Sequence, residues 1–379
     1  MHYDVLIVTP WSLPDSNGVS YVVSCQERLF KSLNLKVCTL SGSIGLDDEE
    51  YKFLGSPPRR LSLKAKNISK EFLGSNTFGV ILIHTIHTWC LSTILSQDGL
   101  IYNKIVYWSH GTSVSSYWNI KPITLMPRLL LGLRDLCYLA AKIGSLSCLV
   151  APYKASFRRF DQRSLDQYLF RLLSKPINIV ENYSNINTEE LIAKQSFSGI
   201  RFAIVGPITN EKGFNEFSSF IRCLKQVSML KRYQIIVTSP EKINTQDCSK
   251  LVYSILQAGG RVVYAPNNES VNNVLWTSDV YVSLSHTEYY SIVQANAMAI
   301  GMPIISRLSG LNRVIKKYKS LCTYHDEKTL FFAIERAVSI FYNRRKFNSV
   351  RPEIYDPSSE AKIKTINLIK TFLGKYHPS

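Results

Sequence analysis

The stretch VSLSHTEYYSIVQANAMAIGMPIISRLSG, residues 282–310, carries the clearest structural pattern of the chain. An apolar run ends in a loop that carries Glu288, and a helix is expected to begin close to Ser291 and to end before Gly301. Pro303 then opens a second apolar run. A strand, a helix and a second strand in this order are typical of a parallel sheet covered by helices.

Short runs rich in Val and Ile recur along the whole chain with helical patterns between them, which extends this prediction to both halves. The polar, turn-rich segment 182–200 interrupts the series and is expected to separate two domains. We therefore predict an α/β fold with two doubly wound domains, at 1–190 and 191–355. The last segment, 356–379, carries apolar residues at helical spacing and is expected to form a helix that crosses back to the first domain. The predicted strands are 3–9, 35–40, 79–84, 104–110, 147–151, 177–180, 201–206, 233–238, 260–265, 279–284, 303–306 and 320–324.

In an open parallel sheet, ligands bind at the carboxyl ends of the strands, where helix amino termini offer free N–H groups to phosphate. The helix that begins at Tyr290 or Ser291 follows such a strand end. We expect a diphosphate to bind at Ser291, Ile292 and Val293.

The same stretch resembles the retaining glycosyltransferases of family 4, in which two acidic residues precede an alanine-methionine helix and a Gly-x-Pro strand start. Glu288 takes the first acidic position, Asn296 the second, and AMAIGMPIIS at 297–306 matches the remainder. The resemblance implies the GT-B fold, with two Rossmann-like domains facing a central cleft. It also implies that Glu288 contacts the hydroxyls of the transferred sugar and that residue 296 holds the ribose. Asn296 departs from the pattern because an amide has one acceptor oxygen where a carboxylate has two. Tyr289, Tyr290 and Ser291 replace the family's usual Gly-Phe-Gly, and two bulky rings in place of one are expected to narrow the sugar pocket.

A second match to this family lies in AIVGPITNEKGF, residues 203–214. Gly206 and Lys212 stand where the family has a glycine and a phosphate-binding lysine, while Pro207 replaces the expected arginine. The resemblance implies that Lys212 carries the charge contact to the donor phosphates alone, as a point charge.

The first half contains weaker matches. Gly18 lies near the start of a predicted helix, where the family has a glycine loop that approaches donor phosphate or acceptor. His110, in the stretch YWSHGTS, matches a His-Gly loop whose histidine lies close to the transferred sugar. His84 and His87 flank the end of another predicted strand and are candidates for lining the acceptor side.

The chain has 45 Lys and Arg residues against 28 Asp and Glu residues, which gives a formal net charge of +17. Such a charge attracts anionic membrane surfaces, pyrophosphate-linked substrates or nucleic acid, and does not choose among them. The excess is concentrated in residues 128–175, for which solvated helix faces and a membrane footprint both remain open. The eight cysteines lie singly, without metal or disulfide spacing, and no apolar run is long enough for a membrane span. These features favour the cytoplasm, with peripheral association at the inner face of the membrane.

No Asp-x-Asp metal motif occurs in the sequence, so we expect no metal and no cofactor other than the nucleotide sugar as substrate. The resemblance implies a retaining, metal-independent hexosyltransferase with Glu288, His110 and Lys212 in the catalytic site. The acceptor that fits the charge is a lipid-linked oligosaccharide or another saccharide in polysaccharide or lipopolysaccharide biosynthesis. Two alternatives stay open at this point. One is a nucleic-acid-directed protein, either a sugar transferase on modified DNA or a DNA binder, and the other is an inactive GT-B scaffold.

Overall fold

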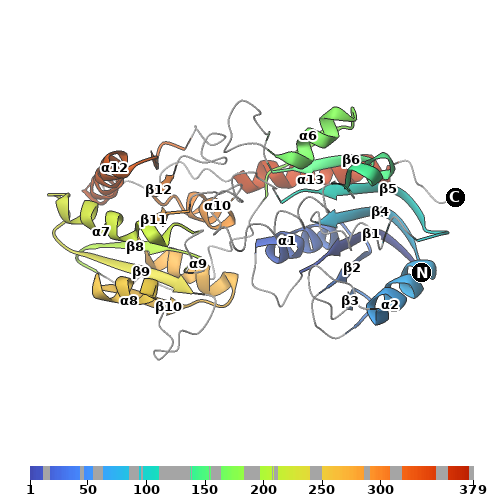
Figure 1. The fold of residues 1–379 in the computed structure, drawn as a ribbon, viewed down its shortest axis with the longest axis horizontal. Coiled ribbons are helices and arrows are strands. Elements are labelled where there is room, and N and C mark those ends of the chain that lie inside the picture. The colour runs from blue at the N-terminus through green and yellow to red at the C-terminus, as the bar shows by residue number, and fades with distance from the viewer. Residues whose placement is uncertain are drawn as a thin grey trace. The chain divides into compact units, whose positions relative to one another are not determined.

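The computed structural model divides the chain into two compact units, which are described separately (Figure 1). The first unit consists of residues 1–183 and 358–379, and the second of residues 184–357. The structure describes residues 1–11, 18–42, 47–53, 63–84, 94, 97–110, 137, 139–152, 154, 164–182, 197–206, 208, 212–239, 250–285, 291–307, 318–346 and 357–374.

The first unit contains a parallel sheet of seven strands in the order β3-β2-β1-β4-β5-β6-β7. The strands are β1 (His2–Thr9), β2 (Val37–Ser41), β3 (Tyr51–Phe53), β4 (Thr77–His84), β5 (Ile101–Trp108), β6 (Cys148–Ala151) and β7 (Ile177–Ile179). The helices described in this unit are α1 (Gly18–Ser32), α2 (Leu63–Gly74), η1 (Ile143–Ser145), α6 (Leu165–Leu172) and α13 (Pro357–Leu373).

Both faces of this sheet are buried, which explains the nearly continuous apolar character of its strands. One face packs on α2 and α6 through side chains such as Leu73 and Phe170. The opposite face packs on α1 and α13 through Val23, Phe30 and Ile369. The unit therefore has the helix-sheet-helix layering of a doubly wound domain.

Helix α13 packs closely on the sheet of the first unit at Gly79, a residue that has no side chain. A Cβ atom on Gly79 of β4 would come within 2.7 Å of both the Asp4 carbonyl oxygen and a methyl group of Leu373. In the middle of the helix, Lys364 forms an ion pair with Glu181 at 3.0 Å. Glycine at position 79 thus permits the close approach of the last helix to the sheet.

The second unit contains a parallel sheet of six strands in the order β10-β9-β8-β11-β12-β13. The strands are β8 (Ile200–Ile204), β9 (Tyr233–Ser239), β10 (Gly260–Tyr264), β11 (Val280–Ser283), β12 (Ile304–Arg307) and β13 (Leu321–Tyr324). The helices described in this unit are η4 (Phe214–Glu216), α7 (Phe217–Gln226), α8 (Lys250–Gln257), α9 (Asn268–Thr277), α10 (Ile292–Ala299) and α12 (Glu327–Lys346). One face of the sheet packs on α7, α8 and α12, and the other on α9 and α10.

These two sheets confirm the predicted fold class of two Rossmann-like, doubly wound α/β halves. The predicted strands all occur, with ends that differ by a few residues, and helix α10 occupies the segment expected between Ser291 and Gly301. One strand, β3, was missed because its three residues, YKF, form no apolar run.

Candidate functional site

The second sheet reverses its strand order between β8 and β11, which lie side by side with Ile204 opposite Val282. In doubly wound folds, ligands bind outside the carboxyl ends of the strands at this switch point. The segments that follow these two strands are the stretches singled out in the sequence, one with Gly206 and Lys212 and the other leading to Ser291. The fold therefore brings them to one edge of one sheet.

The turn at Lys212 and Gly213 is held directly against the end of β11. Gly213 has a φ of 77°, and a Cβ atom there would lie 1.8 Å from the carbonyl oxygen of Leu284. Gly206 also has a positive φ, 137°, and a Cβ atom on it would lie 4.0 Å from the side-chain carbons Cγ and Cδ of Lys212. Both glycines adopt conformations that other residues rarely take, and together they fix the path of the chain around Lys212.

Helix α10 presents its amino terminus at the same edge. Ser291 is the N-cap residue, and its hydroxyl accepts a hydrogen bond from the Gln294 N–H at 3.2 Å. The first N–H groups of an α-helix have no acceptor within the helix, so those of Ile292 and Val293 point out of its amino-terminal end. The first turn carries no acidic side chain that would compete with an anion for the positive end of the helix dipole.

Asn296, at the position of the family's second acid, is buried and paired. Its amide donates a hydrogen bond to Oδ1 of Asn272 in α9 at 2.7 Å. The side chain of Asn296 is 1 % exposed, and its own Oδ1 has no hydrogen-bond partner among the described residues. An unsatisfied buried acceptor is costly, so this oxygen is available to a donor such as a ligand hydroxyl.

An ion pair supports this edge from the other face of the sheet. Arg307, at the end of β12, pairs with Glu216 in η4, directly after the Lys212–Gly213 turn. The guanidinium also lies over the ring of Tyr324 at 5.6 Å from the ring centroid. These contacts join three neighbouring segments and limit the movement of the turn. No local pattern indicates this cluster, because its members are far apart along the chain.

The first sheet has its own switch point, between β1 and β4. Gly18, predicted near a helix start, is the first residue of α1, the helix that follows β1. His84 is the last residue of β4 and lies opposite Trp108 of β5. His110 follows Trp108 by two residues. Polar residues identified in the sequence therefore also lie at the carboxyl end of this sheet.

His84 and His110 form a hydrogen-bonded pair. Nδ1 of His84 lies 2.9 Å from Nε2 of His110, and the two ring centroids are 5.1 Å apart. The His84 ring also stacks on the Trp108 indole, with a centroid distance of 5.7 Å and an interplanar angle of 11°. His84 is fully buried, which differs from the expectation that it would line the acceptor side. Its side chain lies on the face of the sheet that packs on α1 and α13.

Burial keeps both imidazoles neutral. It lowers the pKa of His110 to about 4. Burial, together with the neighbouring His110, lowers the pKa of His84 well below its usual value. Two neutral rings can share one N–H···N hydrogen bond without charge repulsion.

The residue before His110 is anchored separately. The hydroxyls of Ser109 and Ser164 both donate to the carboxylate of Asp166, which is fully buried at the start of α6. The Ser109 N–H also donates to the Val150 carbonyl at 2.8 Å. The backbone that leads into His110 is thus fixed to β6 and α6.

Several predicted site residues lie outside the described residues. These are Glu288 and Tyr290, together with Pro207 and His87. Within the described ranges, no group of three or more His, Cys, Asp or Glu side chains is placed to hold a metal ion. Among the same residues, no helix combines the length and the apolar content that crossing a membrane requires.

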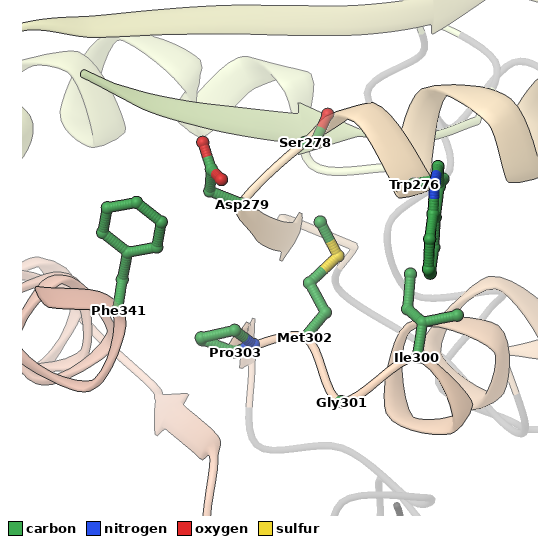
Figure 2. A pocket seen from close by; sticks show the side chains of 8 residues that line it. All are labelled: Trp276, Ser278, Asp279, Ile300, Gly301, Met302, Pro303 and Phe341. Atoms are coloured by element: carbon green, nitrogen blue, oxygen red, sulfur yellow. The ribbon is translucent and has the colours of Figure 1, made fainter. Parts of the chain in front are cut away.

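A pocket of about 220 Å³ lies at the opposite edge of the second sheet (Figure 2). Asp279 and Pro303, in its wall, directly precede β11 and β12, so the pocket is at the amino-terminal ends of these strands. Figure 2 shows Trp276 and Ile300 on one side of it and Phe341 of α12 on another. This mainly apolar pocket is therefore separate from the edge that carries Lys212 and Ser291.

Part of the chain matches a known protein family. Residues 199–339, most of the second unit, match the family model described as glycosyl transferases group 1. No curated protein matches the chain in sequence.

Solved structures match the whole chain. A sucrose-phosphate synthase from Thermosynechococcus elongatus aligns with a TM-score of 0.66 at 12% identity, over 98% of this chain and 97% of the other. The catalytic domain of starch synthase IV from Arabidopsis thaliana, bound to ADP and acarbose, aligns with a TM-score of 0.67 at 11% identity, over 99% and 100%. HepE from Anabaena, in complex with UDP and glucose, aligns with a TM-score of 0.61 at 13% identity, over 99% and 98%.

At these identities the structural matches show the fold alone, and the family model covers most of the second unit. The chain has the GT-B glycosyltransferase fold, and its residues 199–339 form a glycosyl transferases group 1 domain.

Proposed function

We propose that the protein transfers a sugar from a nucleotide diphosphate sugar to an acceptor hydroxyl, with retention of the anomeric configuration. One observation carries the proposal. The Lys212–Gly213 turn is seated on Leu284 at the switch point of the group 1 domain, at the edge where Ser291 begins α10. A cation and a helix amino terminus at one edge form a suitable site for a diphosphate.

In this proposal the leaving diphosphate is stabilised by Lys212 and by the N–H groups of Ile292 and Val293. Preorganised donors of this kind can each lower the barrier by about 3 kcal/mol. The amide of Asn296 takes the ribose, whose hydroxyl would satisfy the unpartnered Oδ1. Because these protein groups meet the phosphate charge, we propose that transfer does not depend on a divalent metal.

Glu288 is proposed to orient the transferred sugar through its hydroxyls, and His110 to lie against the same sugar. His110 would act as a neutral hydrogen-bonding group, since burial lowers its pKa to about 4. The acceptor hydroxyl would then attack on the face from which the diphosphate leaves, and its proton would pass to the departing phosphate oxygen. The complexes of HepE with UDP and glucose and of starch synthase IV with ADP support a nucleotide sugar as the donor.

We further propose a lipid-linked oligosaccharide as the acceptor, in polysaccharide or lipopolysaccharide biosynthesis, with the protein associated peripherally with the membrane. The formal net charge of +17 and the concentration of basic residues in 128–175 support an anionic surface as a partner.

The donor site can be tested by calorimetry with UDP, ADP and GDP, followed by transfer assays with the sugar nucleotides of the base that binds. Lys212→Ala is expected to weaken nucleotide binding about 10- to 100-fold, because a charge-assisted contact to phosphate is lost. Lys225→Ala, an exposed lysine of α7 in the same unit, is the matched control and should bind normally. Glu288→Ala should bind nucleotide but fail to transfer sugar. Normal binding and turnover in the Lys212 and Glu288 variants would refute this site.

A further inference from the structure

The hydrogen bond between His84 and His110 has a consequence for the orientation of His110. The proposed function uses His110 at the transferred sugar but gives no role to His84, which is fully buried. An imidazole has two ring nitrogens, and Nε2 of His110 is 2.9 Å from Nδ1 of His84. Only Nδ1 of His110 is therefore left to face a substrate, and it has no partner among the described residues.

The position of the shared proton follows from the other ring nitrogen of His84. Nε2 of His84 is buried and has no hydrogen-bond partner among the described residues. A buried N–H without an acceptor is rarer in proteins than a buried acceptor without a donor. Nε2 of His84 is therefore the unprotonated nitrogen, and the proton of this ring is on Nδ1. The Nδ1–H group donates the hydrogen bond to Nε2 of His110. A neutral His110 must then carry its own proton on Nδ1.

The surroundings hold both rings in this arrangement. The Trp108 indole packs flat against His84, so the ring cannot turn without disturbing the core beneath α1 and α13. Ser109, bonded to the buried carboxylate of Asp166, fixes the backbone on the other side. The pair is thus oriented before any ligand binds, as an efficient site requires.

We propose that His84 is a positioning residue that donates Nδ1–H to Nε2 of His110 and so presents the Nδ1–H of His110 to an oxygen atom of the transferred sugar. The role at the sugar rests on the proposed function, whereas the proton arrangement rests only on the pair itself. In this arrangement His110 is a hydrogen-bond donor to the sugar and not a base that removes a proton.

The proton arrangement can be read directly by NMR of the full chain labelled with ¹⁵N-histidine. The chain has seven histidines, and the variants His84→Phe and His110→Gln assign the two rings. We expect the protonated nitrogen to be Nδ1 in both rings of the unsubstituted protein. In His84→Phe, the signals of His110 should shift toward the other tautomer. A protonated Nε2 on His110 in the unsubstituted protein would overturn the proposal.

The positioning role can be tested by comparing kcat and KM of His84 variants. His84→Phe keeps a ring against Trp108 but removes the hydrogen bond, and it should lower kcat at least about tenfold, or about 1.4 kcal/mol, with a smaller effect on the KM for the donor. His84→Asn places an amide N–H near the position of Nδ1 and should recover much of the loss. Trp108→Phe disturbs the packing of His84 but leaves the His–His bond and is the control for packing damage. Equal losses in His84→Phe and Trp108→Phe, without recovery in His84→Asn, would refute the positioning role.

The two proposals fail in different ways. If the unsubstituted protein transfers no sugar from any donor tested, the proposed function fails, and with it the role of His84 at the sugar. The NMR measurement would still decide the proton arrangement. If transfer occurs but His110 carries its proton on Nε2, the proposed function stands and this inference fails.

Discussion

Gly213 and Leu284 approach so closely that a Cβ atom on residue 213 would lie 1.8 Å from the Leu284 carbonyl oxygen. The Gly213→Ala variant must therefore move the turn away from β11, in addition to adopting a strained φ of 77°. We expect a loss of about 3 kcal/mol or more in the free energy of unfolding of the second unit, with weakened nucleotide binding. Chemical denaturation and calorimetry would measure the two effects.

The matched control is Gly259→Ala. Gly259 has nearly the same φ, 79°, but nothing lies within 4 Å of the position of its Cβ. This variant should lose only about 1 kcal/mol, the cost of the backbone conformation, and should bind nucleotide normally. Equal effects of the two substitutions would show that the contact with Leu284 does not matter.

Asn272→Ala is expected to weaken nucleotide binding although residue 272 is assigned no contact with the ligand. The substitution removes the acceptor of the Asn296 amide and leaves a buried N–H unpaired, at a cost of about 1–3 kcal/mol in stability. Asn296 would then reorient, and the affinity for UDP, ADP or GDP measured by calorimetry should fall. Asn273→Ala, one residue further along α9, is the control, and an identical loss in that variant would argue against the pair.

The histidine pair predicts a specific dependence of stability on pH. The pKa of His110 is lowered from 6.5 to about 4, so between these values the unfolded chain binds a proton that the folded protein does not. The free energy of unfolding should therefore fall as the pH is lowered from 6.5 to 4, by up to about 3 kcal/mol for this residue. The double variant His84→Asn/His110→Asn should lose this part of the decline, as measured by denaturation at several pH values. Parallel curves for both proteins would contradict the assignment.

The last helix should contribute strongly to the first unit through one of its faces. Ile369 is fully buried in the layer between α13 and the sheet, whereas Ile363 on the same helix is 59% exposed. Ile369→Ala should cost about 2–5 kcal/mol in the free energy of unfolding. Ile363→Ala should change it by less than about 0.5 kcal/mol. Similar values for both variants would mean that α13 does not form part of the core.

Association with membranes should depend on lipid charge. The protein is expected to sediment with vesicles that contain anionic lipid, more weakly at high salt, and not with neutral vesicles. Replacing Arg158, Arg159 and Arg163 by Ser should reduce binding by about 1 kcal/mol for each arginine near the surface. The same number of charges removed at Lys225, Lys231 and Arg232 provides the control. Binding that is indifferent to lipid charge would refute the proposed membrane partner.

Much of the fold could be predicted because a buried parallel strand has a local signature, a short run of apolar residues. The same holds for α10, whose start at the capping Ser291 and end before Gly301 are marked in the sequence. Strand β3, whose three residues are YKF, carries no such run and was not predicted.

The site was only partly predictable, because its geometry depends on contacts between distant residues. Lys212 and Ser291 could be named from their local patterns, yet the seating of Gly213 on Leu284 arises from the pairing of β8 with β11. The register of β4 and β5 likewise creates the contact between His84 and Trp108. Nothing local in the sequence indicates either contact, nor the bond between Asn272 and Asn296.

The close fit of α13 over Gly79 has a consequence for the order of events during synthesis. The layer formed by Val5, Val80 and Trp108 receives Ile369 from the last helix. During translation this face of the sheet stays partly exposed until residues 358–374 have left the ribosome. All strands of the second unit are synthesised before that point. The half of the protein that is translated first is therefore the half that completes its core last.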